Sequence, residues 1–256
     1  MDIWQEEVTL RFGSIDRSDR LTLGAVFGFF QEAAISHASV LGVGRDALNV
    51  NRQAWVLSRL SVFVGQRPRY GETVTVRTWP RGAERLFALR DYDIIDSSGR
   101  TIVRARSCWL VIDIEKRKPL RIQPVIEKLP LNEGLDSLLS GPAVLEPRKD
   151  LKPLGKRRAA YSDIDYFGHV NNVSYVLWIQ DLTPQNLLED AGQMRLDINY
   201  ISETLANEEV EFFSSSFDHE PASPDCPDKM TAALAFEGLR PSSGHSVFRA
   251  ELKLGL

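Results

Sequence analysis

An internal repeat is the feature that most constrains how this chain can fold. Tyr161-Ser-Asp-Ile-Asp165 aligns with Phe12-Gly-Ser-Ile-Asp16, so the chain begins the same pattern a second time. Further segments align as well, the last two after a shorter connection: Gln180-Asp181 over Gln31-Glu32, Glu208-Glu-Val-Glu-Phe212 over Glu72-Thr-Val-Thr-Val76, and Phe248-Arg-Ala250 over Val103-Arg-Ala105. Repetition on this scale predicts two copies of one supersecondary unit, packed about a pseudo-twofold axis as the subunits of a homodimer would be.

The apolar pattern predicts a buried helix and an antiparallel sheet in each copy. Residues at helical spacing predict a long helix over 21–41, namely Leu23, Phe27, Phe30, Ala34 and Leu41. Strand patterns surround this helix in the sequence, at 8–12, 53–65, 72–79, 85–96 and 100–114. In the second copy, Val173–Ile179 falls at the matching helical position. Because a helix this apolar must be covered by the sheet, we expect an α+β fold.

The stretch between the copies has the composition of a linker. Its pattern weakens and prolines interrupt it, at Pro119, Pro124, Pro130, Pro142, Pro147 and Pro153. We expect a first domain at 1–118, a linker at 119–155 with short helices near 124–128 and 133–139, and a second domain at 156–256. A basic stretch follows the linker, namely Lys156, Arg157 and Arg158. It is either a solvated face or a docking patch for an acidic partner.

Composition excludes several classes of protein. The chain is 43% apolar and 26% charged, and no apolar run reaches the ~18–20 residues that a membrane span needs. Its N-terminus resembles neither a signal peptide nor a transit peptide, so we expect a cytoplasmic protein. A net charge of −4 argues against general nucleic-acid binding. Cys108 and Cys226 are expected to be free thiols, and their spacing does not predict a metal site.

Polar side chains are densest between Tyr161 and Tyr175. This stretch holds two acids, a histidine and two amides around a single glycine, namely Asp163, Asp165, His169, Asn171, Asn172 and Gly168. In the repeat alignment His169 lies over Arg20, Asn171 over Thr22, Asn172 over Leu23 and Glu203 over Arg67. Residues found only in the second copy are not needed to build the shared fold. A helix cap explains one or two such residues, so the sequence predicts one chemical site per chain, in the second copy.

These residues favour chemistry on a carbonyl compound without a cofactor. A carboxylate beside a helix N-terminus can act as a general base or as a nucleophile. The backbone N–H groups of Gly168 and His169 are expected to polarise the carbonyl. The chain contains no phosphate-binding loop, no dinucleotide fingerprint and no Gly-x-Ser-x-Gly elbow. Hydrolysis and elimination both stay open, while His37, His219, His245 and Cys226 are expected to be core, rim or surface residues.

The stretch from Ser162 to Tyr175 resembles the signature of hotdog-fold thioesterases, and nearly the whole chain resembles the acyl-acyl-carrier-protein thioesterases of plants and bacteria. Further segments carry the resemblance: Gln31-Glu-Ala-Ala-Ile-Ser-His37, Trp55-Val-Leu-Ser-Arg-Leu60, Tyr70–Trp79, Arg104-Ala-Arg-Ser-Cys-Trp109 and Asn199-Tyr-Ile-Ser-Glu203. The resemblance implies a tandem (double) hotdog fold, each half a long central helix wrapped by a curved antiparallel β-sheet. It also implies hydrolysis of fatty acyl thioesters on acyl carrier protein.

By position, the resemblance implies that Asp165, His169 and Glu203 are catalytic. Gly168, Asn171 and Asn172 are then expected to position the carbonyl. Two positions depart from the family pattern. Phe167 replaces an asparagine found in many members, so a positioning amide is absent and Asp165 becomes the more important catalytic candidate. Thr204 replaces a cysteine of some plant members, so Glu203 is the acid to test.

The first copy is then expected to hold the acyl chain, with Phe27, Phe30, Trp55 and Trp79 as candidate lining residues. Lys156, Arg157 and Arg158 are candidates for contacting the acidic carrier protein. General-base and covalent anhydride routes both stay open. An acyl-CoA thioesterase is the nearest alternative, followed by a hotdog dehydratase and by a non-catalytic acyl-thioester-binding protein. A homodimer is compatible with all of these functions.

Overall fold

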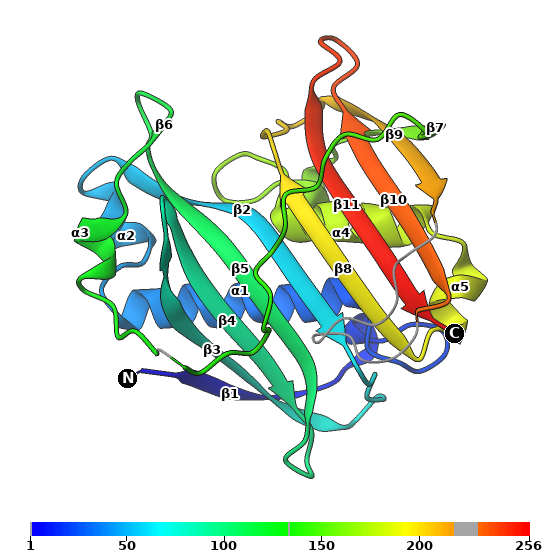
Figure 1. Cartoon of the computed structure of the whole chain (residues 1–256), viewed down its shortest axis with the longest axis horizontal. Helices are drawn as coiled ribbons and strands as arrows, with labels where there is room; N and C mark the ends of the chain where they lie inside the picture. Colours follow the sequence, from blue (N-terminus) through cyan, green and yellow to red (C-terminus); the bar gives the residue numbers. More distant parts are fainter. Residues whose placement is uncertain (1, 133, 218–229) are drawn as a thin grey trace.

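The computed structural model describes residues 2–132, 134–217 and 230–256, and it confirms an α+β fold with a large antiparallel sheet (Figure 1). The first half contains β1 (Trp4–Thr9), η1 (Phe12–Ser14), α1 (Leu23–Val40), α2 (Arg45–Asn49), β2 (Gln53–Val64), β3 (Thr73–Glu84), β4 (Phe87–Ile95), β5 (Thr101–Asp113), β6 (Lys118–Pro119) and α3 (Gln123–Ile126). The second half contains β7 (Lys152–Arg158), η2 (Tyr161–Asp163), α4 (Asn172–Leu182), α5 (Gln185–Asp190), β8 (Gln193–Tyr200), β9 (Glu209–Ser216), β10 (Ala232–Leu239) and β11 (Ser246–Gly255).

The two halves of the sheet run through their strands in equivalent order. From one edge the order is β1, β3, β4, β5 and β2, and from the other edge it is β7, β9, β10, β11 and β8. Strands β2 and β8 meet at the centre as an antiparallel pair, with Arg59 opposite Asn199 and Val64 opposite Met194. The repeat in the sequence therefore has a counterpart in strand order, and the β2–β8 pair joins both halves into a continuous sheet.

The apolar core lies between one face of the sheet and the helices α1 and α4, which Figure 1 shows behind the strands. Helix α1 begins after Thr22, whose Oγ1 accepts a hydrogen bond from the N–H of Ala25 (3.2 Å). Near this end α1 touches α4. A Cβ at Gly24 would lie 2.4 Å from Leu177 Cδ2, and the Gly24 N–H donates to Gln180 Oε1 (2.5 Å). Glycine therefore allows the two helices to pack closely.

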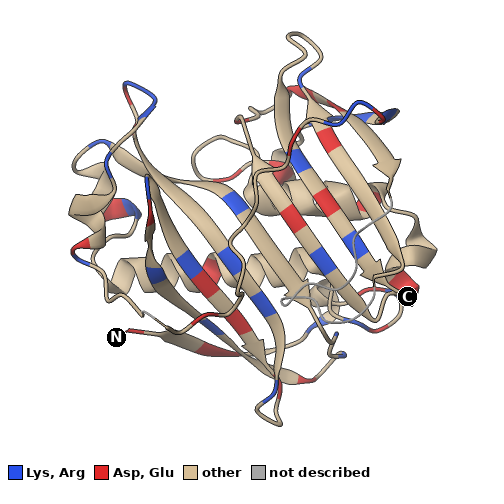
Figure 2. Ribbon diagram, in the orientation of Figure 1, with Lys and Arg blue, Asp and Glu red and all other residues tan. Residues whose placement is uncertain are grey.

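Charged residues lie along the central strands where the connection between the halves crosses the sheet (Figure 2). Arg106 on β5 pairs with Asp91 on β4 (2.6 Å) and with Asp136 of the connection (2.6 Å). Farther along, the N–H of Leu145 donates to Oδ1 of Asn199 on β8 (2.9 Å). Polar contacts thus fix the connection to both halves of the sheet.

Several local expectations differ from the structure. Strand β1 spans Trp4–Thr9 and not 8–12, because Trp4 to Thr9 pair in register with β3. Helix α2 has only five residues, too few to produce a periodic pattern. The described residues 134–139 form no helix, and Ser137 there bonds to the outer face of the sheet instead. Among the described residues, no helix is both long and apolar enough to cross a membrane.

The packing of β10 against β11 gives a stability prediction. An added Cβ at Gly238 would lie 2.4 Å from Phe248 Cε1 and 3.0 Å from Val210 Cγ1. We predict that Gly238→Ala lowers the free energy of unfolding by about 2 kcal/mol, because this overpacks a close-packed core. The matched control is Gly28→Ala in α1, where an added Cβ meets no atom within 4 Å. It should raise stability by up to about 1 kcal/mol. Equal urea midpoints for the two variants would contradict the packing argument.

Candidate functional site

The polar turn after η2 is organised by the carboxylate of Asp165. Its Oδ1 accepts hydrogen bonds from the backbone N–H groups of Phe167 (2.8 Å) and His169 (3.3 Å). The Asp165 N–H donates to the His169 carbonyl (2.8 Å), and the Asp165 carbonyl accepts a hydrogen bond from the Gly168 N–H (3.0 Å). Gly168 has a φ of 82°, which glycine adopts at little cost. The local sequence therefore folds into a tight turn around one carboxylate oxygen.

The first half contains the same turn, built from different residues. Oδ1 of Asp16 accepts from the N–H groups of Ser18 (2.9 Å) and Arg20 (3.2 Å). The Asp16 N–H donates to the Arg20 carbonyl (2.9 Å), and the Asp19 N–H donates to the Asp16 carbonyl (3.0 Å). Asp19, with a φ of 58°, takes the place of Gly168. These bonds recur in both copies, so they build the turn and do not by themselves indicate chemistry.

The second carboxylate oxygen distinguishes the two copies. In the first copy, Oδ2 of Asp16 forms a close ion pair with Arg67, whose side chain is only 3% exposed. Arg67 also donates to the carbonyls of Leu21 (2.8 Å), Leu188 (2.8 Å) and Ala191 (3.3 Å). Burial lowers the pKa of Arg67, and the nearby Asp16 charge opposes that shift. A buried guanidinium therefore occupies the first copy of the site.

The second copy is not closed in this way. Oδ2 of Asp165 accepts no hydrogen bond from any residue that the structure describes, and Asp165 lines a cleft. In the repeat alignment Glu203 takes the position of Arg67. One oxygen of Asp165 therefore holds the turn, and the other is available to a bound molecule or to water.

His169 and Glu203 meet beside the turn. His169 Nε2 lies 3.3 Å from Glu203 Oε2, and these side chains are 37% and 35% exposed. The other oxygen of Glu203 accepts a short hydrogen bond from Arg117. Arg117 belongs to the turn between β5 and β6, so the first half supplies a cation to an acid of the second half. The Glu203 carbonyl also accepts from Arg240 Nη2 (2.6 Å), which fixes the backbone at this position.

Helix α4 begins at Asn172, after the turn. Asn171 is its N-cap and accepts from the Val173 N–H through Oδ1 (3.0 Å). The N–H groups of Gly168 and His169, which the sequence predicts as carbonyl donors, bond within the turn to the Asp165 carbonyl and to Oδ1 of Asp165. The N–H of Asn172 is the first of α4 and donates to no described residue. It also lies at the positive end of the helix dipole.

Two tyrosines, buried Tyr175 and partly buried Tyr200, lie at the start of α4 without adding charge. The Tyr200 hydroxyl donates to the Asn172 carbonyl (3.1 Å). The rings of Tyr175 and Tyr200 are 5.8 Å apart. Burial raises the pKa of Tyr200 well above its usual value and raises the pKa of Tyr175 to about 12. Both phenols therefore stay neutral at physiological pH.

A cleft of about 590 Å³ lies beside the turn, within the size range of small-molecule sites. The second half contributes five lining residues: Asp165, Tyr166, Phe167, Asn171 and Asn172. Residues of α1, α2 and β2 to β5 form most of the rest of the wall, together with Val43, Gly44 and Leu129, so the cleft lies between the two halves. His169 and Glu203 are not among its lining residues.

Only one of the four aromatic residues predicted to hold an acyl chain lines this cleft. That residue is Trp55, whose indole donates to the Val43 carbonyl (2.8 Å). Phe27 and Phe30 are buried in the core, and Trp79 is buried against the connection, where its indole donates to the Leu135 carbonyl (3.0 Å). None of these three residues lines the cleft. The prediction selected the most apolar face of α1, and that face packs on the sheet. The cleft uses the adjacent face instead.

The basic residues predicted to bind a carrier protein lie on β7, the edge strand of the second half. Lys156 lies 3.4 Å from Glu211, and Arg157 lies 2.9 Å from Asp181. Arg158 is exposed and has no ion-pair partner among the described residues. Two of the three cations therefore already have acidic partners within the chain.

Other candidate groups do not form a second site. His37 is fully buried and His245 is exposed. Burial raises the pKa of the Cys108 thiol to about 11, which leaves it unreactive at neutral pH. His219 and Cys226 lie outside the described residues.

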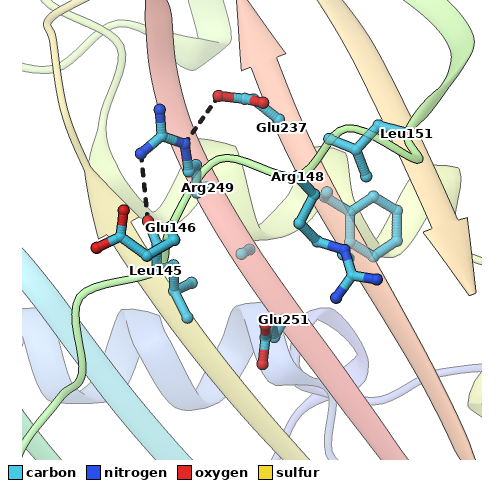
Figure 3. Close-up of a pocket in the computed structure, with 10 residues that line it drawn as sticks. Leu145, Glu146, Arg148, Leu151, Glu237, Arg249 and Glu251 are labelled. Carbon is cyan, nitrogen blue, oxygen red and sulfur yellow. Dashed lines mark hydrogen bonds and ion pairs between the residues drawn. The ribbon is translucent and has the colours of Figure 1, made fainter. Parts of the chain in front are cut away.

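A hollow on the outer face of the sheet lies beneath the connection (Figure 3). Arg249 crosses it, donating to Glu237 Oε1 (2.8 Å) and to the Leu145 carbonyl (3.2 Å). The volume of the hollow is about 10 Å³, which is room for about one water molecule. This hollow is therefore too small for an organic ligand.

Sequence reasoning missed two arginines near the site. Arg117 is 86 residues from Glu203 in the sequence, and no local pattern connects them. Arg90 lies on the same strand face as the buried residues Ala88, Tyr92 and Ile94 and lines the cleft. An arginine at an inward position of an apolar strand was the signal that could have identified it.

The two copies of the turn give a matched pair of stability predictions. Asp165→Asn keeps an Oδ1 acceptor for the turn, so the free energy of unfolding should change by less than about 1 kcal/mol. Asp16→Asn keeps the same acceptor but leaves buried Arg67 without a counter-charge, which should cost about 3 kcal/mol. Urea denaturation of both variants measures the difference. Equal losses would show that Arg67 does not distinguish the copies energetically.

Comparisons with known proteins agree on one family. Residues 1–129 match the acyl-ACP thioesterase N-terminal domain, and residues 152–238 match the acyl-ACP thioesterase C-terminal domain. A palmitoyl-acyl carrier protein thioesterase of Cuphea hookeriana is 26% identical over 215 residues, which are 77% of this chain and 51% of that protein. The chain thus spans about half the length of this curated relative.

Solved structures give the same result. An acyl-ACP thioesterase from Bacteroides thetaiotaomicron is 28% identical, with a TM-score of 0.80 over 99% of this chain and 98% of that one. A 12:0-ACP thioesterase from Umbellularia californica is 19% identical, with a TM-score of 0.77 over 99% and 94% of the two chains, and it supports the fold alone. On this evidence, the chain belongs to the acyl-ACP thioesterase family.

Proposed function

We propose that this protein hydrolyses the thioester of fatty acyl chains on acyl carrier protein, releasing the fatty acid and the carrier. The observation that carries this proposal is the difference between the two turns. The first-copy carboxylate is closed by Arg67, whereas Asp165 presents an uncommitted oxygen at the wall of a cleft of about 590 Å³. The names of the relatives supply the substrate class, and the carboxylate supplies the chemistry.

In the proposed reaction the acyl chain occupies the cleft and its carbonyl lies at the start of α4. The Asn172 N–H polarises the carbonyl oxygen and stabilises the negative charge that forms there. Oδ2 of Asp165 takes a proton from water, the resulting hydroxide attacks the carbonyl carbon, and the carbon–sulfur bond breaks. The thiolate then takes up a proton and the fatty acid leaves.

A covalent route uses the same groups. Oδ2 of Asp165 would attack the carbonyl carbon directly, and water would then cleave the mixed anhydride. Single turnover in oxygen-18 water separates the two routes, because only the anhydride route can leave solvent oxygen in the enzyme carboxylate.

His169, Glu203 and Arg117 have supporting roles in this proposal. Glu203 lies between the His169 imidazole and the Arg117 guanidinium, within contact distance of both. We propose that Arg117 holds Glu203 in the orientation that His169 needs. His169 then exchanges protons with the water or the leaving thiol.

We also propose that each half is a hotdog domain, which makes the chain a tandem hotdog of residues 1–118 and 156–256 joined by 119–155. The duplicated strand order and the separate N- and C-terminal family matches support this division. Under this proposal the first copy holds the acyl chain and the second performs the chemistry. Cytoplasmic location and a homodimer stay predictions.

Substitutions in the site test the catalytic assignment. With a medium- or long-chain acyl carrier protein as substrate, Asp165→Asn should lower kcat by at least about 100-fold, because the base or nucleophile is lost. Glu203→Gln and Arg117→Gln should each lower kcat by about tenfold, the effect of one charge-assisted contact. Steady-state kinetics with carrier-bound and matched CoA-bound chains measures these losses and identifies the preferred thiol.

The control for Arg117 is Lys118→Gln, which removes an exposed cation one residue away in the same connection. It should leave kcat unchanged. The assignment fails if Asp165→Asn and Glu203→Gln both retain most of the wild-type activity while remaining folded.

Arg158 provides a test of carrier docking on β7. We propose that this exposed cation contacts the acidic carrier, so Arg158→Glu should raise KM for acyl carrier protein several-fold and leave kcat unchanged. The increase should shrink at high salt, because a surface contact is screened. Arg11→Glu, the same change at an exposed arginine of the first half, is the control. An unchanged KM for Arg158→Glu would exclude docking through this residue.

A further inference from the structure

The connection from β8 to β9 carries Glu203, and its backbone is held in the same way as the corresponding connection of the first half. The N–H groups of residues 201–202 donate to the Val247 carbonyl (2.9 and 3.1 Å). The N–H groups of residues 65–66 donate to the Ile102 carbonyl (2.8 and 3.3 Å). These positions correspond in the repeat alignment. The bonds therefore belong to the shared fold and do not by themselves indicate a role in catalysis.

The neighbouring hairpin turn begins with a different residue in each half. The turn between β4 and β5 begins with Asp96, and the turn between β10 and β11 begins with Arg240. Oδ1 of Asp96 accepts hydrogen bonds from the N–H groups of Ser98 (2.9 Å) and Arg100 (3.0 Å). In the first half, the side chain at this position therefore folds back onto its own turn.

The side chain of Arg240 instead reaches the connection that carries Glu203. Its Nη2 donates to the Glu203 carbonyl (2.6 Å) and lies 3.6 Å from Glu208 Oε2. The same oxygen of Glu208 accepts a hydrogen bond from the Leu205 N–H (3.0 Å), and Leu205 forms an antiparallel bridge with His169. One guanidinium thus contacts the main chain at Glu203 and the acid that holds the backbone partner of His169.

The contact between His169 and Glu203 needs support from the surrounding chain. Their side chains are 37% and 35% exposed, and a pair this exposed contributes little to holding its own geometry. The main-chain position of Glu203 determines where its side chain starts, so fixing that position limits how far the carboxylate can move from His169 Nε2 (3.3 Å). The bond from Arg240 is charge-assisted, which makes it stronger than a bond between neutral groups.

We propose that Arg240 is a positioning residue, which holds the main chain of Glu203 so that the Glu203 carboxylate meets His169. It acts through Glu203 and is not among the residues that line the cleft. The comparison of the halves supports this role, because the hairpin forms in the first half with Asp96 in place of a cation. The role rests on the proposed function, in which His169 and Glu203 assist hydrolysis.

The first test replaces Arg240 and measures hydrolysis of an acyl-carrier-protein thioester. Arg240→Met has a similar length but no charge and no donor, so it should lower kcat about tenfold and change KM less than about twofold. Arg240→Lys keeps the charge and one donor group and should recover part of the loss. The control is Arg100→Met, at an exposed arginine of the corresponding turn in the first half, which should leave kcat unchanged. An unchanged kcat in folded Arg240→Met, or an equal loss in Arg100→Met, would overturn the role.

A double-mutant cycle distinguishes positioning from a general structural effect. In a Glu203→Ala background the group that Arg240 positions is already lost, so Arg240→Met should lower kcat by less than about twofold further. A loss of about tenfold in both backgrounds would overturn the role, because the arginine would then act independently of Glu203. The same cycle with Arg240→Lys provides the test if Arg240→Met does not fold.

A spectroscopic measurement that needs no turnover separates this inference from the proposed function. In nitrogen-15-labelled protein at fixed pH, the ring signals of His169 depend on the carboxylate beside the ring, and His169→Gln identifies them. Arg240→Met should move these signals toward their positions in Glu203→Ala, whereas Arg100→Met should leave them in place.

The two failures then give different results. If no acyl thioester is hydrolysed but the His169 signals move as expected, the proposed function fails and the positioning of Glu203 by Arg240 stands. If thioesters are hydrolysed and Arg240→Met changes neither the signals nor kcat, the positioning role fails and the proposed function stands.

Discussion

The antiparallel pairing of β2 with β8 is the constraint on which the rest of the structure depends. It joins two half-sheets of equivalent strand order into one, and so it fixes how the helix of each half lies relative to the other. Backbone hydrogen bonds along the pair hold this arrangement, and Ser61 adds a short side-chain bond to Asp197 across it. The cleft exists because of this junction, since its walls come from α1, α2 and β2 to β5 on one side and from the polar turn on the other.

A comparison of the two turns shows which of their hydrogen bonds belong to the shared fold and which feature is found only in the second copy. Both copies form the same shape with two hydrogen bonds between backbone groups and two from backbone N–H groups to one aspartate oxygen, so the turn uses that carboxylate in each half. What differs is the partner of the second oxygen. In the first copy a buried arginine takes it and also binds three backbone carbonyls, two of them in the other half. The first copy therefore contributes to assembly, and the second is left open to solvent and substrate.

Many of the secondary-structure elements and the position of the polar turn could be predicted from the sequence, because they depend on residues close together along the chain. Apolar spacing located α1 and the strands β2 to β5, and the repeat located the polar turn of the second copy. The structure places two of the residues found only in that copy, His169 and Glu203, in contact. Other features depend on contacts between distant residues. The engagement of the Gly168 and His169 N–H groups follows from turn geometry, and the contact of Arg117 with Glu203 follows from the β2–β8 junction. Phe27 and Phe30 lie in the core and not at the described cleft, because hydrophobicity identifies the core face of a helix and not the wall of a cleft.

The carboxylate of the second copy lacks the buried ion pair that the first copy has. If Glu203 were an arginine, as at the equivalent position of the first copy, Asp165 could be neutralised by an internal ion pair and would be a weaker base. With an acid there instead, Oδ2 of Asp165 has no partner among the described residues, and Arg117 pairs with Glu203. Unsatisfied polar groups are tolerated in folded proteins mainly where a ligand completes them.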